Sequence, residues 1–179
     1  MPWCARSATS SRERAACVSD DAAVKFVDVS VRDVSVGSGV VIVRPSNVYE
    51  CRLGDRVFVG PFCEIQKGVV VGARTRVQSH SFLCEGVTIG ADCVIAHGVM
   101  FINDLFSDGG PAHGDRSKWR DTTVGDRVSI GSNATILPVA ICNDVVIGAG
   151  AVIARDITEP GVYAGNPARM LRKHTPASP

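Results

Sequence analysis

The chain has 179 residues, enough for one domain with a continuous hydrophobic core. Its net charge of +1 excludes a global basic field that would hold nucleic acid or an anionic membrane, and no apolar run approaches the roughly 20 residues that span a bilayer. Aromatic residues make up only 6% of the chain and valine is abundant, which favours β-structure over long amphipathic helices.

Residues 1–21 are rich in Ser, Ala and Arg but lack the apolar centre of a secretory signal. We expect a disordered tail, with a transit peptide as the alternative. The seven cysteines include no C-x-x-C pair. An odd count without such pairs favours a reduced, cytoplasmic chain with buried thiols, without disulfides and without a metal site.

Residues 22–166 are expected to form one domain, because large apolar residues recur at every sixth position. The uninterrupted run is Leu53, Val59, Ile65, Val71, Val77, Leu83, Ile89, Ile95 and Phe101. The residue four places after each of the first eight is small or β-branched, and Gly often follows the apolar residue directly. Each hexad therefore predicts one short strand and one tight turn.

The same period continues on both sides of this run. Earlier members are Val36, Ile42 and Val48, and later members are Val124, Ile130, Ile136, Ile141, Ile147 and Ile153. The steps from Val48 to Leu53 and from Ile136 to Ile141 are five residues instead of six. We expect such one-residue deletions to be tolerated at turns, because the strands on either side can still stack.

Two segments depart from the repeat. Residues 102–123 form a polar, Gly-containing excursion, and a long loop thrown out of a regular solenoid is more often functional than decorative. In the final segment, residues 167–179, we expect a short helix followed by a tail, with Asn166 as the cap and Pro167 at the first helical position.

A period of six suits a solenoid of stacked short parallel strands. The hexads resemble the left-handed parallel β-helix of the hexapeptide-repeat acyltransferases, in which three hexads make a triangular coil and residues 18 apart stack. The resemblance, not the spacing, implies the left-handedness. The predicted fold class is all-β: a left-handed parallel β-helix with one long loop excursion and a short C-terminal helix.

Stacking at a distance of 18 residues predicts two columns of turn residues. One column holds Lys67, Glu85 and Asn103, and the next holds Pro61, Ser79 and His97. Because the excursion leaves the solenoid at Asn103, we expect it to fold over a surface on which Glu85, Asn103 and His97 lie within a few coils of one another.

A narrower resemblance covers roughly residues 36–173. The segments "CEGVTIG", "HGVMFIND", "IGSNATILP", "VIGAGAVIARDI" and "AGNPAR" are similar to those of acetyl-CoA-dependent N-acetyltransferases that act on nucleotide-linked amino sugars. The resemblance implies acetyl-CoA as cosubstrate, a nucleotide-linked amino deoxysugar as acceptor, and a homotrimer with active sites between subunits. It does not identify the sugar, the position of the amine or the nucleotide.

Amide formation needs a neutral attacking amine, a donor for the carbonyl oxygen and a proton for the leaving thiolate. His97 has the intrinsic pKa to accept a proton near neutrality, and Asn103 can orient the amine or donate to the oxyanion. Several members of the resembling group use no histidine, and there the leaving sulfur takes the proton, so both routes stay open. The expected substrate-binding residues are Glu85, Asp104, His80, Gln78, Trp119 and Arg120.

In the resembling family the pantetheine arm of CoA lies extended along a groove between two subunits. On this chain the resemblance implies that CoA is bound by Gly131, Ala149, Arg155, Asn166, Pro167 and Arg169. The Arg side chains would form ion pairs with the phosphates of CoA.

Two alternatives remain. An O-acetyltransferase would need a base strong enough for a hydroxyl group, for which His113 in the excursion is the candidate. A non-enzymatic β-helical scaffold is the other alternative, but a scaffold has little need for a long polar excursion next to Asn103.

Overall fold

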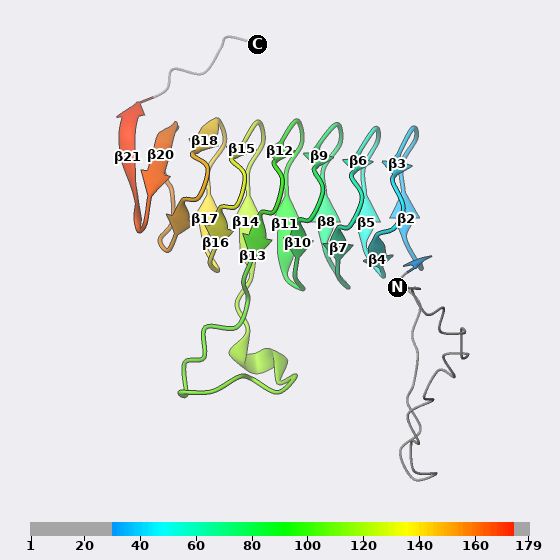
Figure 1. Cartoon of the computed structure of the whole chain (residues 1–179), viewed down its shortest axis with the longest axis horizontal. Helices are drawn as coiled ribbons and strands as arrows, with labels where there is room; N and C mark the ends of the chain where they lie inside the picture. Colours follow the sequence, from blue (N-terminus) through cyan, green and yellow to red (C-terminus); the bar gives the residue numbers. More distant parts are fainter. Residues whose placement is uncertain (1–29, 174–179) are drawn as a thin grey trace, which may run out of the picture.

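The computed structural model describes residues 30–173, which wind into a solenoid of short parallel strands. The coils lie side by side along the long axis, and the excursion leaves after strand β13 (Figure 1). Residues 1–29 and 174–179 lie outside the described part, so the expected N-terminal tail is not tested. No helix within residues 30–173 is long and apolar enough to span a membrane.

The strands form three sheets, one along each side of the triangular coil, in which all pairs are parallel except that of β20 with β21. Sheet A contains β1 (Val31–Arg32), β4 (Asn47–Tyr49), β7 (Glu64–Ile65), β10 (Phe82–Leu83), β13 (Met100–Phe101), β16 (Thr135–Ile136) and β19 (Val152–Ile153). Sheet B contains β2 (Ser35–Val36), β5 (Arg52–Leu53), β8 (Val70–Val71), β11 (Val87–Ile89), β14 (Thr122–Val124) and β17 (Ala140–Ile141). Sheet C contains β3 (Val41–Ile42), β6 (Phe58–Val59), β9 (Arg76–Val77), β12 (Val94–Ile95), β15 (Ser129–Ile130), β18 (Val145–Ile147), β20 (Gly161–Gly165) and β21 (Ala168–Lys173).

Turns at three corners join the sheets. We call the turns from sheet A to sheet B corner 1, those from sheet B to sheet C corner 2, and those from sheet C back to sheet A corner 3. Strands of successive coils pair in register, as Ile65 with Leu83 and Val77 with Ile95. The prediction that residues 18 apart stack is therefore confirmed for these coils.

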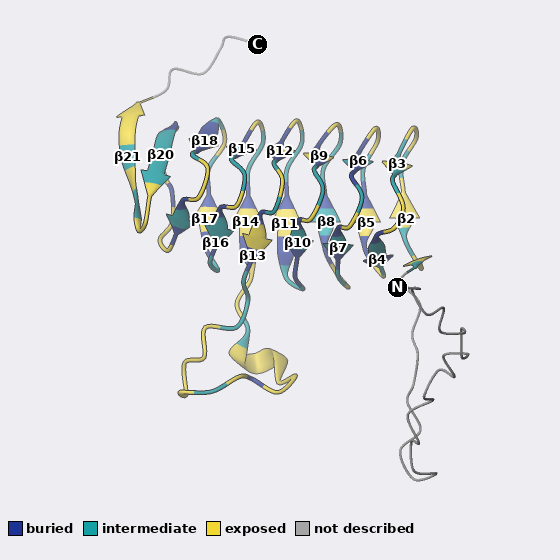
Figure 2. Cartoon of the chain, in the orientation of Figure 1, coloured by how far each residue is buried: buried dark blue, intermediate teal, exposed yellow. Residues whose placement is uncertain are grey.

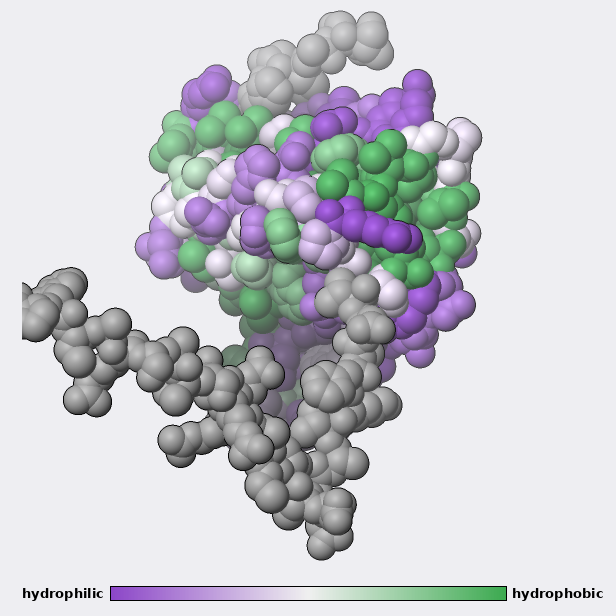
Figure 3. Space-filling view, turned by 45° about the vertical axis from the view of Figure 1, so that its right-hand side comes forward, coloured by the Kyte–Doolittle hydropathy of each residue, from purple (hydrophilic) through white to green (hydrophobic). Residues whose placement is uncertain are grey.

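The apolar residues of the hexads fill the interior of the solenoid, and all nine members of the uninterrupted run are at most 1% exposed. Figure 2 shows the buried residues inside the coils and the exposed ones along the excursion. Apolar residues also gather on the surface of the first coils, which Figure 3 brings forward; Val36 is 55% exposed and Val41 51% exposed there.

Variation in chain length is confined to corner 1 until the final coil. The two predicted five-residue steps fall there, as does a third from Val31 to Val36, and the excursion leaves from the same corner. Stacking survives the deletions, because Val48 still pairs with Ile65 and Leu53 with Val71. Every step between core positions across corners 2 and 3 is six residues up to Ile153.

Buried hydroxyl and thiol groups satisfy turn carbonyls at corner 3. The Ser46 hydroxyl donates to Gly60 O at 3.0 Å, and the Ser81 hydroxyl donates to Ala96 O at 2.9 Å. Cys63 takes the same place between them, with its Sγ 3.1 Å from Gln78 O. The small residues of the hexads thus donate hydrogen bonds to buried carbonyl groups that would otherwise lack a partner.

The expectation of buried, unpaired thiols is confirmed for most of the described cysteines. Cys51, Cys63, Cys84 and Cys93 are buried, Cys142 is half-buried, and none of these five is in a disulfide. Burial raises the pKa of the Cys51 thiol to about 11 and that of the Cys84 thiol to about 12, because the thiolate would lose its hydration. These thiols are poor nucleophiles at neutral pH.

The predicted C-terminal helix is wrong. Residues Ala168–Lys173 form β21, which pairs antiparallel with β20, and Asn166 and Pro167 form the connecting turn. β20 itself pairs with β18, so a helix would leave the outer edge of β20 without backbone partners. Strand pairing at the end of the solenoid outweighs the local capping preference of Asn166.

The excursion is slightly shorter than predicted. β14 begins at Thr122, which pairs with Val87, so the excursion spans 102–121 instead of 102–123. Thr122 is buried at 1% exposure, which returns the chain to the core two residues before Val124. Within the excursion, a 3-10 helix, η1 (Arg116–Lys118), is capped by the Asp115 side chain.

Candidate active site

Corner 3 carries His97 together with several of the residues expected to bind CoA. The ring Nδ1 of His97 lies 2.8 Å from Ser79 Oγ, one coil away, so the predicted column of Ser79 and His97 is present. The turn is fixed from both neighbouring coils, since Gly98 N donates to Ser79 O at 3.0 Å and Asn133 N donates to His97 O at 2.9 Å. His97 itself is exposed.

Two further predicted residues precede His97 on this corner. His80 stacks on Phe62, with ring centroids 5.0 Å apart and an angle of 24° between the ring planes. Gln78 follows β9 directly, and its backbone carbonyl accepts the Cys63 thiol while its side chain is half-buried. Both residues lie one coil from His97, on its N-terminal side.

On the C-terminal side of His97, the turns of corner 3 carry small side chains, which leave the backbone exposed. A Cβ atom at Gly131 would lie 2.5 Å from Ala149 N, so the packing of successive coils requires glycine at this position. Ala149 is exposed, and its N–H donates to no other described residue. Corner 3 can therefore offer backbone groups to an extended ligand, and Asn166 and Pro167 lie farther along the same corner.

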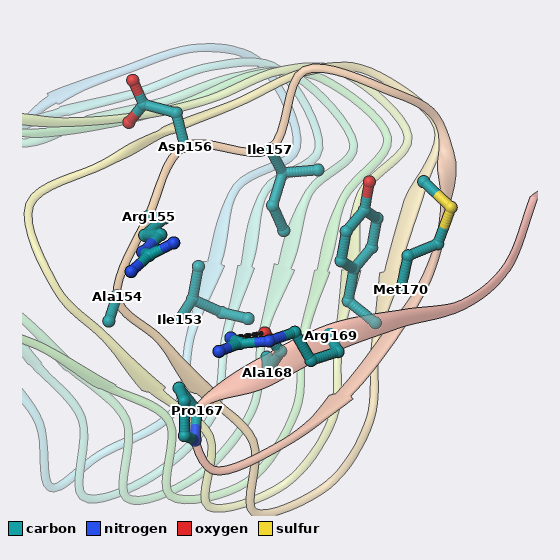
Figure 4. A pocket seen from close by; sticks show the side chains of 10 residues that line it. Ile153, Ala154, Arg155, Asp156, Ile157, Pro167, Ala168, Arg169 and Met170 are labelled. Atoms are coloured by element: carbon teal, nitrogen blue, oxygen red, sulfur yellow. Dashed lines mark hydrogen bonds between the residues drawn. The ribbon is translucent and has the colours of Figure 1, made fainter.

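The last coil holds a cavity of about 330 Å³ that brings together Arg155, Pro167 and Arg169, three of the residues expected to bind CoA. Figure 4 shows both guanidinium groups at this cavity, with Ile153 between them in that view. Its other apolar walls include Ile157, Tyr163 and Met170. A pocket with apolar walls and two guanidinium groups suits a ligand that combines a planar ring with negatively charged groups.

Glu85 and Asn103 lie at corner 1, in successive coils as predicted. Asn103 Nδ2 donates to the Glu85 carbonyl oxygen at 3.1 Å, so this amide ties the root of the excursion to the coil before it. The Glu85 carboxylate, with only 19% of its side chain exposed, pairs with Arg116 of the excursion at 2.6 Å. This ion pair was not expected from the sequence.

The excursion is held by its own polar contacts. Asp104 accepts hydrogen bonds from Ala112 N at 2.7 Å and from Phe106 N at 2.9 Å, and these bonds lower the pKa of the Asp104 carboxyl. Lys118 pairs with Asp108 at 2.8 Å. Asp104 thus organises the loop through contacts that the sequence did not predict, and its expected role in substrate binding stays a prediction.

Trp119 and Arg120 close the excursion. The guanidinium carbon of Arg116 lies 5.9 Å from the centroid of the Trp119 ring, and Arg120 N donates to Asn103 O at 3.1 Å. The Arg120 side chain lines a small polar hollow of about 210 Å³ together with Asp104 and Lys118. Trp119 is not among the residues that line this hollow.

One chain alone does not bring His97 together with Glu85 and Asn103. β13 separates corner 3 from corner 1, and the excursion projects away from the solenoid (Figure 1). The prediction that the excursion folds over a surface containing all three side chains is not met within the chain. A triangular coil places successive corners one strand apart, and the excursion stands out from its own corner.

The structure adds Ser79 and Arg116 to the residues of interest. Ser79 was visible as a member of the His97 column, but the stacking pattern does not reveal which side chains bond. Arg116 had no sequence signal, because a loop without a repeat has no register from which its partner could be inferred. His113 is exposed, and none of the described residues hydrogen-bonds to its ring.

Known proteins resemble this chain in sequence. A family model, the hexapeptide repeat of succinyl-transferase, matches residues 121–155. The bifunctional protein GlmU of Limosilactobacillus fermentum is 36% identical over 125 residues, which are 69% of this chain and 25% of that protein. Serine acetyltransferase of Mycobacterium tuberculosis is 33% identical over 117 residues, which are 64% of this chain and 47% of that protein. The chain belongs to the hexapeptide-repeat acyltransferase family.

Solved structures share the fold of this hexapeptide-repeat acyltransferase. A mutant of AntD, an N-acyltransferase from Bacillus cereus, in complex with dTDP and coenzyme A has a TM-score of 0.69 at 21% identity, covering 79% of this chain and 84% of that chain. A mutant of perosamine N-acetyltransferase from Caulobacter crescentus in complex with CoA and GDP-perosamine has a TM-score of 0.57 at 21% identity, covering 76% and 56%.

These similarities confirm the predicted fold class, a left-handed parallel β-helix, apart from the C-terminal helix. The hexapeptide-repeat acyltransferase described here spans about a quarter of the length of the GlmU relative and about half that of the serine acetyltransferase. The acceptor of this chain therefore has to be argued from its own residues.

Proposed function

We propose that this protein transfers the acetyl group of acetyl-CoA to the amine of a nucleotide-linked amino deoxysugar. The observation that carries the proposal is the arrangement of corner 3, where the hydrogen-bonded His97 is followed by Gly131, Ala149 and then Pro167 at the cavity with two arginines. At about 4.8 Å per stacked strand, the three coils from His97 to Pro167 cover about 14 Å. An extended pantetheine arm between a phosphate end at the cavity and a thioester at His97 fits this row.

In the proposed reaction, the acceptor amine attacks the thioester carbonyl carbon and a C–N bond forms. His97 Nε2 takes the proton that the nitrogen loses, and the tetrahedral intermediate then collapses with cleavage of the C–S bond. The proton passes on to the departing thiolate, so the histidine returns to its neutral form. A covalent acyl-cysteine step is disfavoured, because burial holds the pKa of the Cys51 and Cys84 thiols near 11 and 12.

An amino-sugar acceptor is supported by two proteins of the same fold. AntD is described as an N-acyltransferase in complex with dTDP and coenzyme A, and perosamine N-acetyltransferase is in complex with CoA and GDP-perosamine. The O-acetyltransferase alternative depended on His113, which lies exposed without a hydrogen-bond partner among the described residues. Nothing in the geometry of the excursion favours that alternative.

The proposal includes a homotrimer with active sites between subunits. Because the excursion projects from corner 1 and His97 lies at corner 3, a neighbouring subunit is the means of bringing Asn103, Glu85, Trp119 and Arg120 to that histidine. Closed rotational symmetry would build the same site three times.

The test of the reaction is thiol release from acetyl-CoA with a panel of nucleotide amino sugars. We expect release with at least one amine acceptor and a loss of kcat of roughly 10²–10⁴-fold for His97→Asn, the usual contribution of a positioned base. If no amine in the panel releases thiol, the proposed reaction is wrong. If His97→Asn retains full kcat, His97 is not the base.

The test of the shared site is subunit complementation between His97→Asn and Asn103→Ala chains. If His97 of one chain works with Asn103 of the next, random mixing leaves about one quarter of the interfaces intact, since each partner is correct with a probability of about one half. Mixed refolding should then restore about a quarter of wild-type activity. Restoration of none would mean that both residues act within one chain.

A further inference from the structure

We propose that Ser79 is a positioning residue that holds His97 with Nδ1 protonated and Nε2 free to accept a proton. The inference rests on the proposed function and deepens it. It begins from the 2.8 Å contact between Ser79 Oγ and His97 Nδ1, two side chains 18 residues apart on stacked turns. Of the three histidines in the described range, His97 alone has a hydrogen-bonded ring nitrogen.

The distance between the two turns is fixed by the fold. β9 and β12 lead into these turns and pair in register, with Arg76 opposite Val94 and Val77 opposite Ile95. Gly98 N donates to Ser79 O on the far side of the turn, and a Cβ atom at Gly98 would overlap Asn133 Oδ1 of the next coil. His97 therefore stands on a backbone that is held by the coils before and after it.

Among the described residues, the Ser79 hydroxyl bonds to His97 and to no turn carbonyl. At the same corner, the buried Ser46 and Ser81 hydroxyls donate to the turn carbonyls of Gly60 and Ala96. The half-buried Ser79 hydroxyl makes no such bond, and its partner is the imidazole of His97. Ser46 and Ser81 stand four residues after a core position, whereas Ser79 stands two residues after one, in the column of His97.

The chemistry of imidazole then decides what the contact does. A neutral imidazole has one N–H and one acceptor nitrogen, and a hydrogen bond at one nitrogen selects the state of the other. If Nδ1–H donates to Ser79 Oγ, Nε2 is left as the acceptor that amine acylation needs, and the hydroxyl proton turns to solvent. After proton transfer, the same oxygen still accepts Nδ1–H of the imidazolium, so the contact serves both states.

The test measures the tautomer directly as well as the rate. Nitrogen NMR of labelled protein, with the His97 signals assigned by His97→Asn, should show Nδ1–H in the wild type. In Ser79→Ala the ring should shift towards Nε2–H, which free histidine prefers. For the same variant we expect kcat to fall roughly 3- to 10-fold, the worth of one neutral hydrogen bond. The KM for acetyl-CoA should not change, and Ser79→Thr should restore kcat because it keeps the hydroxyl group.

Ser38→Ala is the matched control, since Ser38 occupies the same place two residues after a core position but lies at corner 2, exposed. An equal loss of kcat in Ser38→Ala, or an unchanged tautomer in Ser79→Ala, would overturn the inference. These outcomes can be told apart from a failure of the proposed function. If the wild type releases thiol but Ser79→Ala changes neither kcat nor the tautomer, only the role of Ser79 is wrong. If the wild type releases no thiol, the proposed function is wrong, but the NMR spectrum still shows which ring nitrogen of His97 is protonated.

Discussion

Replacement of Phe101 by alanine should destabilise the solenoid where the excursion begins. Phe101 is fully buried and is the largest of the side chains that are less than 2% exposed. Burial of roughly 150–250 Å² of aromatic side chain at about 25 cal/mol per Å² is worth about 4–6 kcal/mol, and Phe-to-Ala replacements in cores cost about 3–5 kcal/mol. We expect a loss of about 4 kcal/mol, a large share of the roughly 5–15 kcal/mol that stabilises a typical domain.

The free energy of unfolding is to be measured by urea denaturation followed by circular dichroism. Phe101→Leu should cost less than about 1.5 kcal/mol, because it keeps most of the volume. Phe106→Ala should change stability by no more than about 0.5 kcal/mol, since Phe106 is 58% exposed in the excursion. A cost below about 1 kcal/mol for Phe101→Ala, or an equal cost for Phe106→Ala, would refute the assignment of Phe101 to the core.

Three further predictions concern the site. Gly131→Ala should raise the KM for acetyl-CoA and cost about 1–3 kcal/mol in urea denaturation, because its Cβ would lie 2.5 Å from a backbone nitrogen of the next coil; an unchanged KM would remove that turn from the CoA site. Arg116→Gln should speed hydrogen exchange within the excursion and raise the acceptor KM while leaving the acetyl-CoA KM alone, because it breaks the ion pair with Glu85; unchanged exchange would mean that the pair does not hold the loop. The lowered pKa of Asp104 means that its contribution to loop order is complete above the ordinary carboxyl pKa of 3.8 and is lost as the pH falls through the lower folded value. Proteolysis of the excursion should therefore increase in acid, and Asp104→Asn should be cleaved equally at neutral and acid pH; acid resistance of the wild type would contradict this.

The hexad core could be predicted from sequence because its signal repeats. Each position from Leu53 to Phe101 reports the same environment, so an error at one position is corrected by its neighbours. The end of the chain has no such repetition. Asn166 and Pro167 suit a helix start as well as a tight turn, and only the unpaired edge of β20 decides between them.

The candidate site was predictable as columns but not as a surface. Stacking correctly placed Ser79 with His97 and Glu85 with Asn103. It could not show that the excursion stands out from the solenoid, because the direction of a loop depends on contacts such as that of Arg116 with Glu85, which have no period. Hydrogen bonds and ion pairs between particular side chains depend on their rotamers, which the repeat pattern does not predict.

The confinement of length changes to corner 1 has a consequence for how such a protein can be altered. Corners 2 and 3 advance by six residues at every step up to Ile153, so corner 3 is a straight edge with one turn about every 4.8 Å. Segments can be added or removed at corner 1, for example beside Pro138, without shifting that edge. Insertion of one complete coil between Gly131 and Ala149 would instead lengthen the edge by one step. The distance between the two ends of an extended ligand could thus be set in whole coils.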